Sequence, residues 1–146
     1  MARYLLVAHQ TAECDELREA AANLAAEDPE AEFVLLVPAT PVNSLLVWER
    51  GETYEVAVKR AASAGERLRQ HGLRVVDARP GDADPLAAVA DEIDDGGRYH
   101  AIVVSTLPAG VSRWLKMDVP SRLNRNFPRH RVIHVIARPG VATAKA

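Results

Sequence analysis

The stretch from Val103 to Ser121 reads VVSTLPAGVSRWLKMDVPS, and it begins inside a run, AIVVS at 101–105, that is apolar on both faces. Such a run suits a strand in the interior of a parallel sheet that helices cover on both sides. A long turn with a proline follows, and a helix is predicted at roughly 119–126. What this turn can hold depends on which backbone N–H groups it offers.

Four further runs have the same apolar character: YLLVA at 4–8, FVLLV at 33–37, LRVVDA at 73–78 and VIHVIA at 132–137. Between them, apolar residues recur every three or four positions, as in the set that starts at Leu17, which is typical of helices. The alternation predicts a doubly wound α/β domain with a five-stranded parallel sheet and helices on both faces. The pattern leaves the strand orders 3-2-1-4-5 and 2-1-3-4-5 open. Both place a ligand crevice where the winding direction reverses.

Helix ends are signalled by capping residues. Thr11 is predicted to cap the first helix, and Gly72 to end the second. Asp84-Pro85 opens a helix at about 84–95, and Gly96-Gly97 turns the chain into the next strand. One domain over residues 1–138 with a flexible tail at 139–146 is expected.

The composition excludes several classes of partner. The chain has 146 residues, 48% of them hydrophobic, and a formal net charge of -2. This charge provides no field to attract nucleic acid or an anionic membrane, and no apolar run reaches the length of a membrane span. The single Cys14 has no cysteine partner for a disulfide or a metal site, which agrees with a reducing compartment. A soluble cytoplasmic protein without nucleic-acid or membrane partners is expected.

Three segments together resemble the universal stress protein family: the opening RYLLVAH, the GDADP ahead of a helix, and VVST followed by a long turn and VPSRL. The resemblance extends to about Ala137. It implies the 3-2-1-4-5 sheet of the adenine nucleotide alpha hydrolase-like fold, with the first and fourth strands adjacent at its centre.

The resemblance also shows where the chain departs from the ATP-binding members. Their phosphate loop carries two glycines and then a third that is followed by serine or threonine. These positions fall here on Ser105, Pro108, Asp118 and Val119. The family's aspartate at the end of the first strand, which helps to bind the nucleoside, falls near His9.

These departures disfavour ATP on physical grounds. Glycine supplies positive φ angles and lets backbone N–H groups approach phosphate, and Pro108 can do neither. Asp118 is predicted to cap the last helix with its carboxylate, where a phosphate would sit. That repulsion costs roughly 3 kcal/mol, and each lost charge-assisted hydrogen bond about 1.5–3 kcal/mol. No cofactor is therefore expected, with ATP or AMP as the disfavoured alternative.

A ligand crevice is nevertheless predicted after the first and fourth strands. Its candidate residues are Ala8, His9, Gln10, Val37, Pro38, Ser105, Thr106, Leu107, Gly110, Arg113, Val119 and Ser121. His9 is either a ligand donor or a hydrogen-bonded loop histidine. Arg113 and Lys116 are the candidates for binding an anion, and Trp114 with Leu115 is predicted to anchor the turn. No catalytic or metal-binding residues are predicted.

Two other features have both a functional and a purely structural interpretation. The connection PATPVNSLLVWERG at 38–51 is either a lid or a contact surface, or it covers the sheet end. The basic residues near the last helix could bind an anion or nucleic acid, but we expect them to interact with the negative end of the helix dipole instead. They are Arg122, Arg125, Arg129, His130 and Arg131.

The fifth strand predicts a homodimer because it is a sheet edge in the 3-2-1-4-5 order and contains no proline and few charges. The edge residues are Val132, Ile133, His134, Val135 and Ile136. Dimerisation through this strand is also what the resemblance implies.

The leading functional hypothesis is a non-enzymatic, stress-associated or regulatory protein that acts through self-association, a partner or a small ligand other than ATP. The alternative is a protein that holds AMP or ATP through Val37, His9 and Arg113 in a changed pose. An enzyme of the same broader fold is the third possibility. It is disfavoured because the sequence has neither a serine-glycine-glycine phosphate loop nor an HxGH-like signature.

Overall fold

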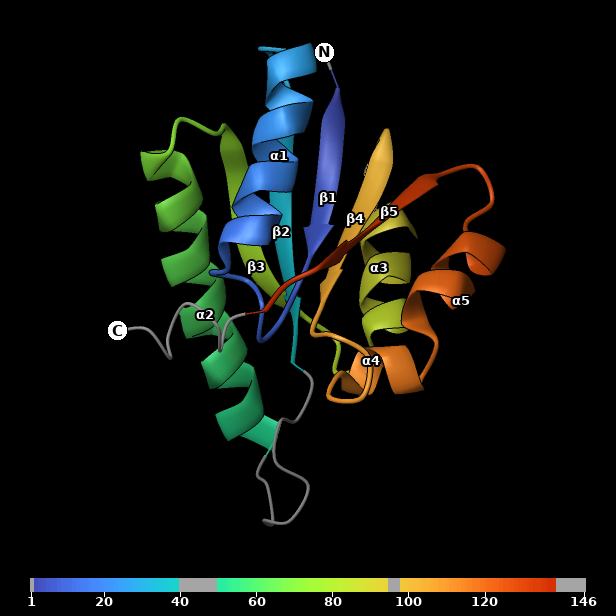
Figure 1. Ribbon diagram of the computed structural model, residues 1–146. Helices are drawn as coiled ribbons and strands as arrows, with labels where there is room; N and C mark the ends of the chain where they lie inside the picture. The colour runs from blue at the N-terminus through green and yellow to red at the C-terminus, as the bar shows by residue number, and fades with distance from the viewer. Residues whose placement is uncertain (1, 40–49, 95–97, 139–146) are drawn as a thin grey trace.

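The computed structural model describes residues 2–39, 50–94 and 98–138, which form a five-stranded parallel sheet in the order β3-β2-β1-β4-β5 (Figure 1). The strands are β1 (Arg3–Val7), β2 (Glu32–Pro38), β3 (Val75–Gly81), β4 (Ala101–Thr106) and β5 (Arg131–Ile136). The helices are α1 (Asp15–Glu27), α2 (Arg50–Gln70), α3 (Pro85–Asp94), α4 (Arg113–Lys116) and α5 (Val119–Asn126). The predicted fold class and strand order are confirmed.

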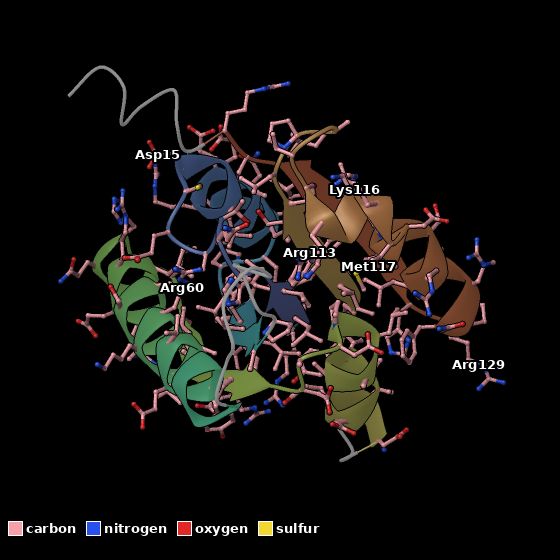
Figure 2. All side chains as sticks on the ribbon, turned by 90° about the horizontal axis from the view of Figure 1, so that it is seen from below. Asp15, Arg60, Arg113, Lys116, Met117 and Arg129 are labelled. Atoms are coloured by element: carbon pink, nitrogen blue, oxygen red, sulfur yellow. The ribbon has the colours of Figure 1, made fainter. Side chains whose placement is uncertain are left out.

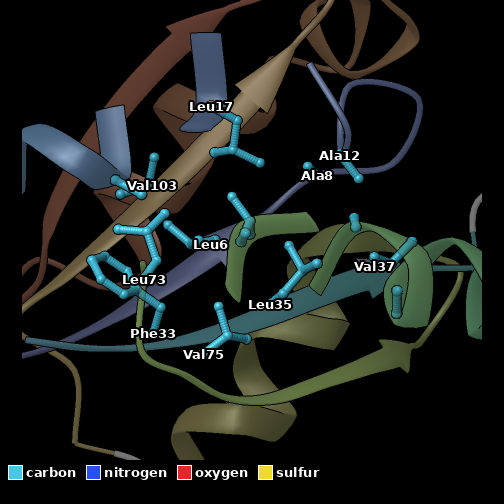
Figure 3. Close-up of a cluster of buried hydrophobic side chains, with 14 of the residues drawn as sticks. Leu6, Ala8, Ala12, Leu17, Phe33, Leu35, Val37, Leu73, Val75 and Val103 are labelled. Atoms are coloured by element: carbon cyan, nitrogen blue, oxygen red, sulfur yellow. The ribbon is translucent and has the colours of Figure 1, made fainter. Parts of the chain in front are cut away.

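The sheet separates two apolar cores, which explains why the strand sequences are apolar on both faces. Leu6 and Val103 pack with buried residues of α1 and α2 on one side (Figure 3). Leu5 and Ile102 pack with α3 and α5 on the other. Neighbouring residues of one strand therefore serve opposite cores, since successive side chains point to opposite faces.

The observed helix ends agree in part with those predicted from the sequence. Gly72 adopts the positive φ of 87° expected of a helix-ending glycine. The Asp84 carboxylate accepts a hydrogen bond from the Leu86 backbone N–H at 3.0 Å, at the start of α3. The prediction for Thr11 is wrong because α1 begins at Asp15, and Cys14 precedes it without a capping side-chain bond.

Three predicted features lie outside the described residues: the central part of the 38–51 connection, the Gly96-Gly97 turn and the tail at 139–146. Within the described part of the chain, no helix is both long and apolar enough to cross a membrane.

The two edges of the sheet are β3 and β5. On β5, Val132, Ile133 and Val135 are half-buried, whereas Ile136 is 42% exposed. On β3, Val76 is 47% exposed. The placement of β5 at an edge, from which a homodimer was predicted, is confirmed. Pairing with a second chain stays a prediction.

Candidate functional site

A cavity of about 320 Å³ opens at the carboxyl ends of β1 and β4, the place predicted for a crevice. It is lined by His9, Gln10, Thr11, Ser105, Thr106, Leu107, Val111, Ser112, Arg113, Trp114 and Lys116. Three segments supply these side chains: the turn after β1, the end of β4, and the turn from 107 to 112 with α4. Figure 2 shows Arg113 and Lys116 on α4, with Arg60 on α2.

The turn after β1 brings Thr11 against β4. The Ala12 N–H donates to the His9 carbonyl at 3.2 Å, and the Cys14 N–H donates to the Thr11 carbonyl at 3.0 Å. These bonds form a turn that places the Thr11 hydroxyl 2.6 Å from the Ser105 hydroxyl. Thr11 is thus used for a contact between neighbouring strand ends, which explains why it does not cap α1.

The turn after β4 is closed by its own hydrogen bonds. The Pro108 carbonyl accepts from the Val111 and Ser112 N–H groups at 3.2 and 3.0 Å, and Gly110 supplies a positive φ of 94°. The Ser112 hydroxyl caps α4 by accepting from the Leu115 N–H at 3.1 Å. Trp114 is 6% exposed and packs in the core on the α3 side. Trp114 therefore anchors the turn, as predicted, whereas Leu115 is only half-buried.

The prediction for Asp118 is wrong. Its carboxylate makes no capping hydrogen bond to α5 and lies 3.8 Å from an Arg125 nitrogen. The cause is its left-handed backbone, with φ 57° and ψ 38°, because a capping side chain requires an extended backbone. The Asp118 backbone therefore adopts a conformation that favours glycine and that aspartate tolerates better than most residues.

Among the titratable residues that line the cavity, His9 has a clearly shifted pKa. It is 5% exposed, and its Nδ1 lies 2.9 Å from an Arg60 guanidinium nitrogen. A guanidinium only donates, so Nδ1 accepts and the ring proton is on Nε2. Burial, and secondly the positive charge of Arg60, lower the pKa of His9 to about 4. His9 is therefore neutral at pH 7, and its Nε2 has no partner among the described residues.

The structure brings together half of the predicted crevice residues. His9, Gln10, Ser105, Thr106, Leu107 and Arg113 line the cavity. Ala8, Val37, Pro38 and Val119 are buried without lining it, and Gly110 and Ser121 are exposed elsewhere. Five lining residues were not in the predicted crevice set: Thr11, Val111, Ser112, Trp114, which was predicted only as an anchor, and Lys116, which was predicted only as an anion candidate. The only sequence signal for them was their place in the turns after the first and fourth strands.

The charges of the site favour an anion. Arg113 and Lys116 line the cavity, and the lining that the structure describes contains no carboxylate. Hydroxyls of Thr11, Ser105 and Ser112 add donors and acceptors. Within residues 2–39, 50–94 and 98–138, no three metal-ligating side chains come together.

The depressed pKa of His9 predicts a pH-dependent loss of stability. The unfolded chain binds the proton near pH 6.5 and the folded chain only near pH 4, so His9 lowers stability as the pH falls through this window. At pH 5 the loss should be about 2 kcal/mol. Urea unfolding at pH 7 and pH 5 should show it in the native protein but not in His9→Gln. The pKa of His134, also lowered by burial, affects both proteins equally. Equal losses in the two proteins would contradict the assignment.

Comparison with known proteins supports the fold. No family model matches the sequence, and no curated protein matches it. Among solved structures, the crystal structure of a universal stress protein in complex with cAMP aligns with 93% of this chain and 97% of that chain, at a TM-score of 0.55 and 17% sequence identity. The chain therefore has a universal stress protein-like fold over nearly its whole length.

Proposed function

We propose that this chain is a non-enzymatic regulatory protein of the universal stress protein type that binds a small nucleotide with a single phosphate at the carboxyl ends of β1 and β4. The observation that carries this proposal is the cavity itself, in which two cations and several hydroxyls face a space without a carboxylate. Its volume of about 320 Å³ is at the small end of the range for small-molecule sites.

The shape of the turn argues against ATP in the usual pose. Pro108 offers no N–H, and the start of α5, with Val119 and Ser121, does not line the cavity. A triphosphate would therefore lack the backbone donors that a glycine-rich loop provides. A single phosphate needs fewer donors, and Arg113 with Lys116 can supply them.

The solved neighbour binds cAMP, which makes cAMP a suitable probe for this chain. Isothermal titration calorimetry with cAMP, AMP and ATP tests the proposal. We expect saturable binding of cAMP or AMP and an affinity for ATP that is at least tenfold weaker. The proposal fails if neither monophosphate binds or if ATP binds most tightly.

The state of His9 supports a non-enzymatic role. With Nδ1 occupied by Arg60 and Nε2 protonated, the ring has no free basic nitrogen to activate a nearby hydroxyl. Cys14 does not line the cavity, and burial is the largest cause that raises the pKa of its thiol. The free thiol of Cys14 agrees with the location that we propose for the protein, the reducing cytoplasm. Incubation with cAMP, AMP and ATP should give no turnover beyond the buffer control.

We also propose that the protein is a homodimer joined through β5. An edge strand whose apolar side chains are half-exposed favours pairing with a second copy. Light scattering at micromolar concentration should give a dimer mass, and Ile136→Lys should shift it towards the monomer. Val76→Lys is a matched control, because Val76 has a similar exposure on the opposite edge strand. A native monomer, or equal effects of the two substitutions, would contradict pairing through β5.

A further inference from the structure

We infer that His9 is a specificity-determining hydrogen-bond donor: Arg60 holds its ring in the Nε2–H tautomer, so the ligand group at the end of β1 must be an acceptor, such as a carbonyl oxygen, a ring nitrogen or a phosphoryl oxygen. The inference rests on the proposed function and deepens it, because it states the polarity that the ligand presents at this end of the cavity.

The tautomer follows from the contact between His9 and Arg60. The two nitrogens lie 2.9 Å apart, and arginine carries no acceptor. An Nδ1–H would point one donor at another, so the ring must keep its proton on Nε2. Arg60 lies on α2, 51 residues along the chain, and it does not line the cavity itself. It acts through His9 and is a positioning residue.

The second observation is the unsatisfied Nε2. His9 is 5% exposed and lines the cavity, and its Nε2 finds no partner among the described residues. Buried N–H groups are nearly always paired in native proteins, so an unpaired one on a residue that lines a cavity indicates a place for an acceptor. Because the ring is neutral, it adds a donor without adding charge.

The surroundings agree with an acceptor rather than a donor on the ligand. The described lining offers no carboxylate, and its formal charges are the cations of Arg113 and Lys116. Gln10, Thr11 and Ser105 can adapt to either role, but His9 with Arg60 behind it cannot. A ligand amine or hydroxyl proton aimed at Nε2 would therefore meet another proton.

Nuclear magnetic resonance of the ¹⁵N-labelled full chain at pH 7 tests the tautomer directly. We expect a protonated Nε2 and an unprotonated Nδ1 for His9. Addition of cAMP, and in a separate sample of inorganic phosphate, should shift the Nε2–H resonance. Arg60→Met should give a mixture of tautomers, whereas Arg60→Lys, which keeps a donor, should restore the native one. An Nδ1–H tautomer or an imidazolium in the native protein would overturn the inference.

Three substitutions at His9 then separate donor from acceptor in calorimetric titrations with cAMP. His9→Gln keeps a donor and should bind within about threefold of the native protein. His9→Leu removes the donor without adding charge and should bind about tenfold more weakly, as expected for one lost hydrogen bond. His9→Glu has the size of glutamine but only accepts, and it should bind most weakly of the three. Far-ultraviolet circular dichroism checks that each variant is folded.

The outcomes distinguish this inference from the proposed function. If cAMP binds but the Nε2 resonance does not move and His9→Leu binds as well as His9→Gln, the inference is wrong and the proposed function stands. If cAMP does not bind but phosphate moves the resonance, the nucleotide is wrong and the donor role of His9 stands. If neither ligand moves the resonance, His9 is not a ligand donor.

Discussion

Replacement of Trp114 by alanine is expected to lower the free energy of unfolding by about 3–5 kcal/mol and the melting temperature by roughly 10 °C. The indole is 6% exposed and packs in the core formed by β1, β4, α3 and α5. Alanine would leave a cavity in this core. The helix α4 has only four residues and is fixed at its start by the Ser112 cap, so it is too short to shift and fill that cavity. Thermal and urea unfolding measure the loss.

Met117→Ala is the control for this substitution. Met117 ends the same helix but is 36% exposed, so its truncation should cost less than about 1 kcal/mol. Because Trp114 also lines the cavity, its loss should weaken cAMP binding, whereas the loss of Met117 should not. Equal destabilisation by the two substitutions would mean that Trp114 does not anchor the turn.

The fold could be predicted because its signals are local. The run AIVVS lies entirely in β4, and every residue of that strand is buried. Gly72 ends a helix through its own backbone conformation, and Asp84 starts one by accepting a hydrogen bond from the N–H two residues further on. The strand order is not a local property, and it was predicted only from the resemblance to a known family.

The site could be predicted in its location but not in its contacts. The alternation of strands and helices places a crevice after β1 and β4, but the partners within it are far apart in sequence. Thr11 meets Ser105 across 94 positions, and His9 meets Arg60 across 51. A threonine just before a helix is an ordinary capping signal, so the sequence alone favoured the wrong role. The prediction for Asp118 failed for a similar reason. An aspartate just before a helix is also an ordinary capping signal, and the sequence does not reveal that its backbone is left-handed.

The double substitution Arg113→Gln and Lys116→Gln is expected to weaken cAMP binding about 100-fold. A charge-assisted hydrogen bond contributes about 1.5–3 kcal/mol, and the low end applies here because both side chains are exposed in part to water. Two such bonds at that end give about 3 kcal/mol, which corresponds to roughly two orders of magnitude in affinity. Both side chains line the cavity, and Figure 2 shows them on α4. Calorimetric titration measures the loss.

Two controls make this result specific to the cavity. Arg129→Gln removes one positive charge from the far side of α5, outside the cavity lining, and should leave the affinity within about twofold (Figure 2). The unfolding free energy of the double variant should change by less than about 1 kcal/mol, since substitutions at exposed positions have small effects. The affinity of the native protein should also fall as salt is raised, and that of the double variant should fall less, because fewer charges attract the phosphate. If Arg129→Gln weakened binding as much as either cavity substitution alone, the attraction would come from the overall charge of the surface, and α4 would not be the phosphate site.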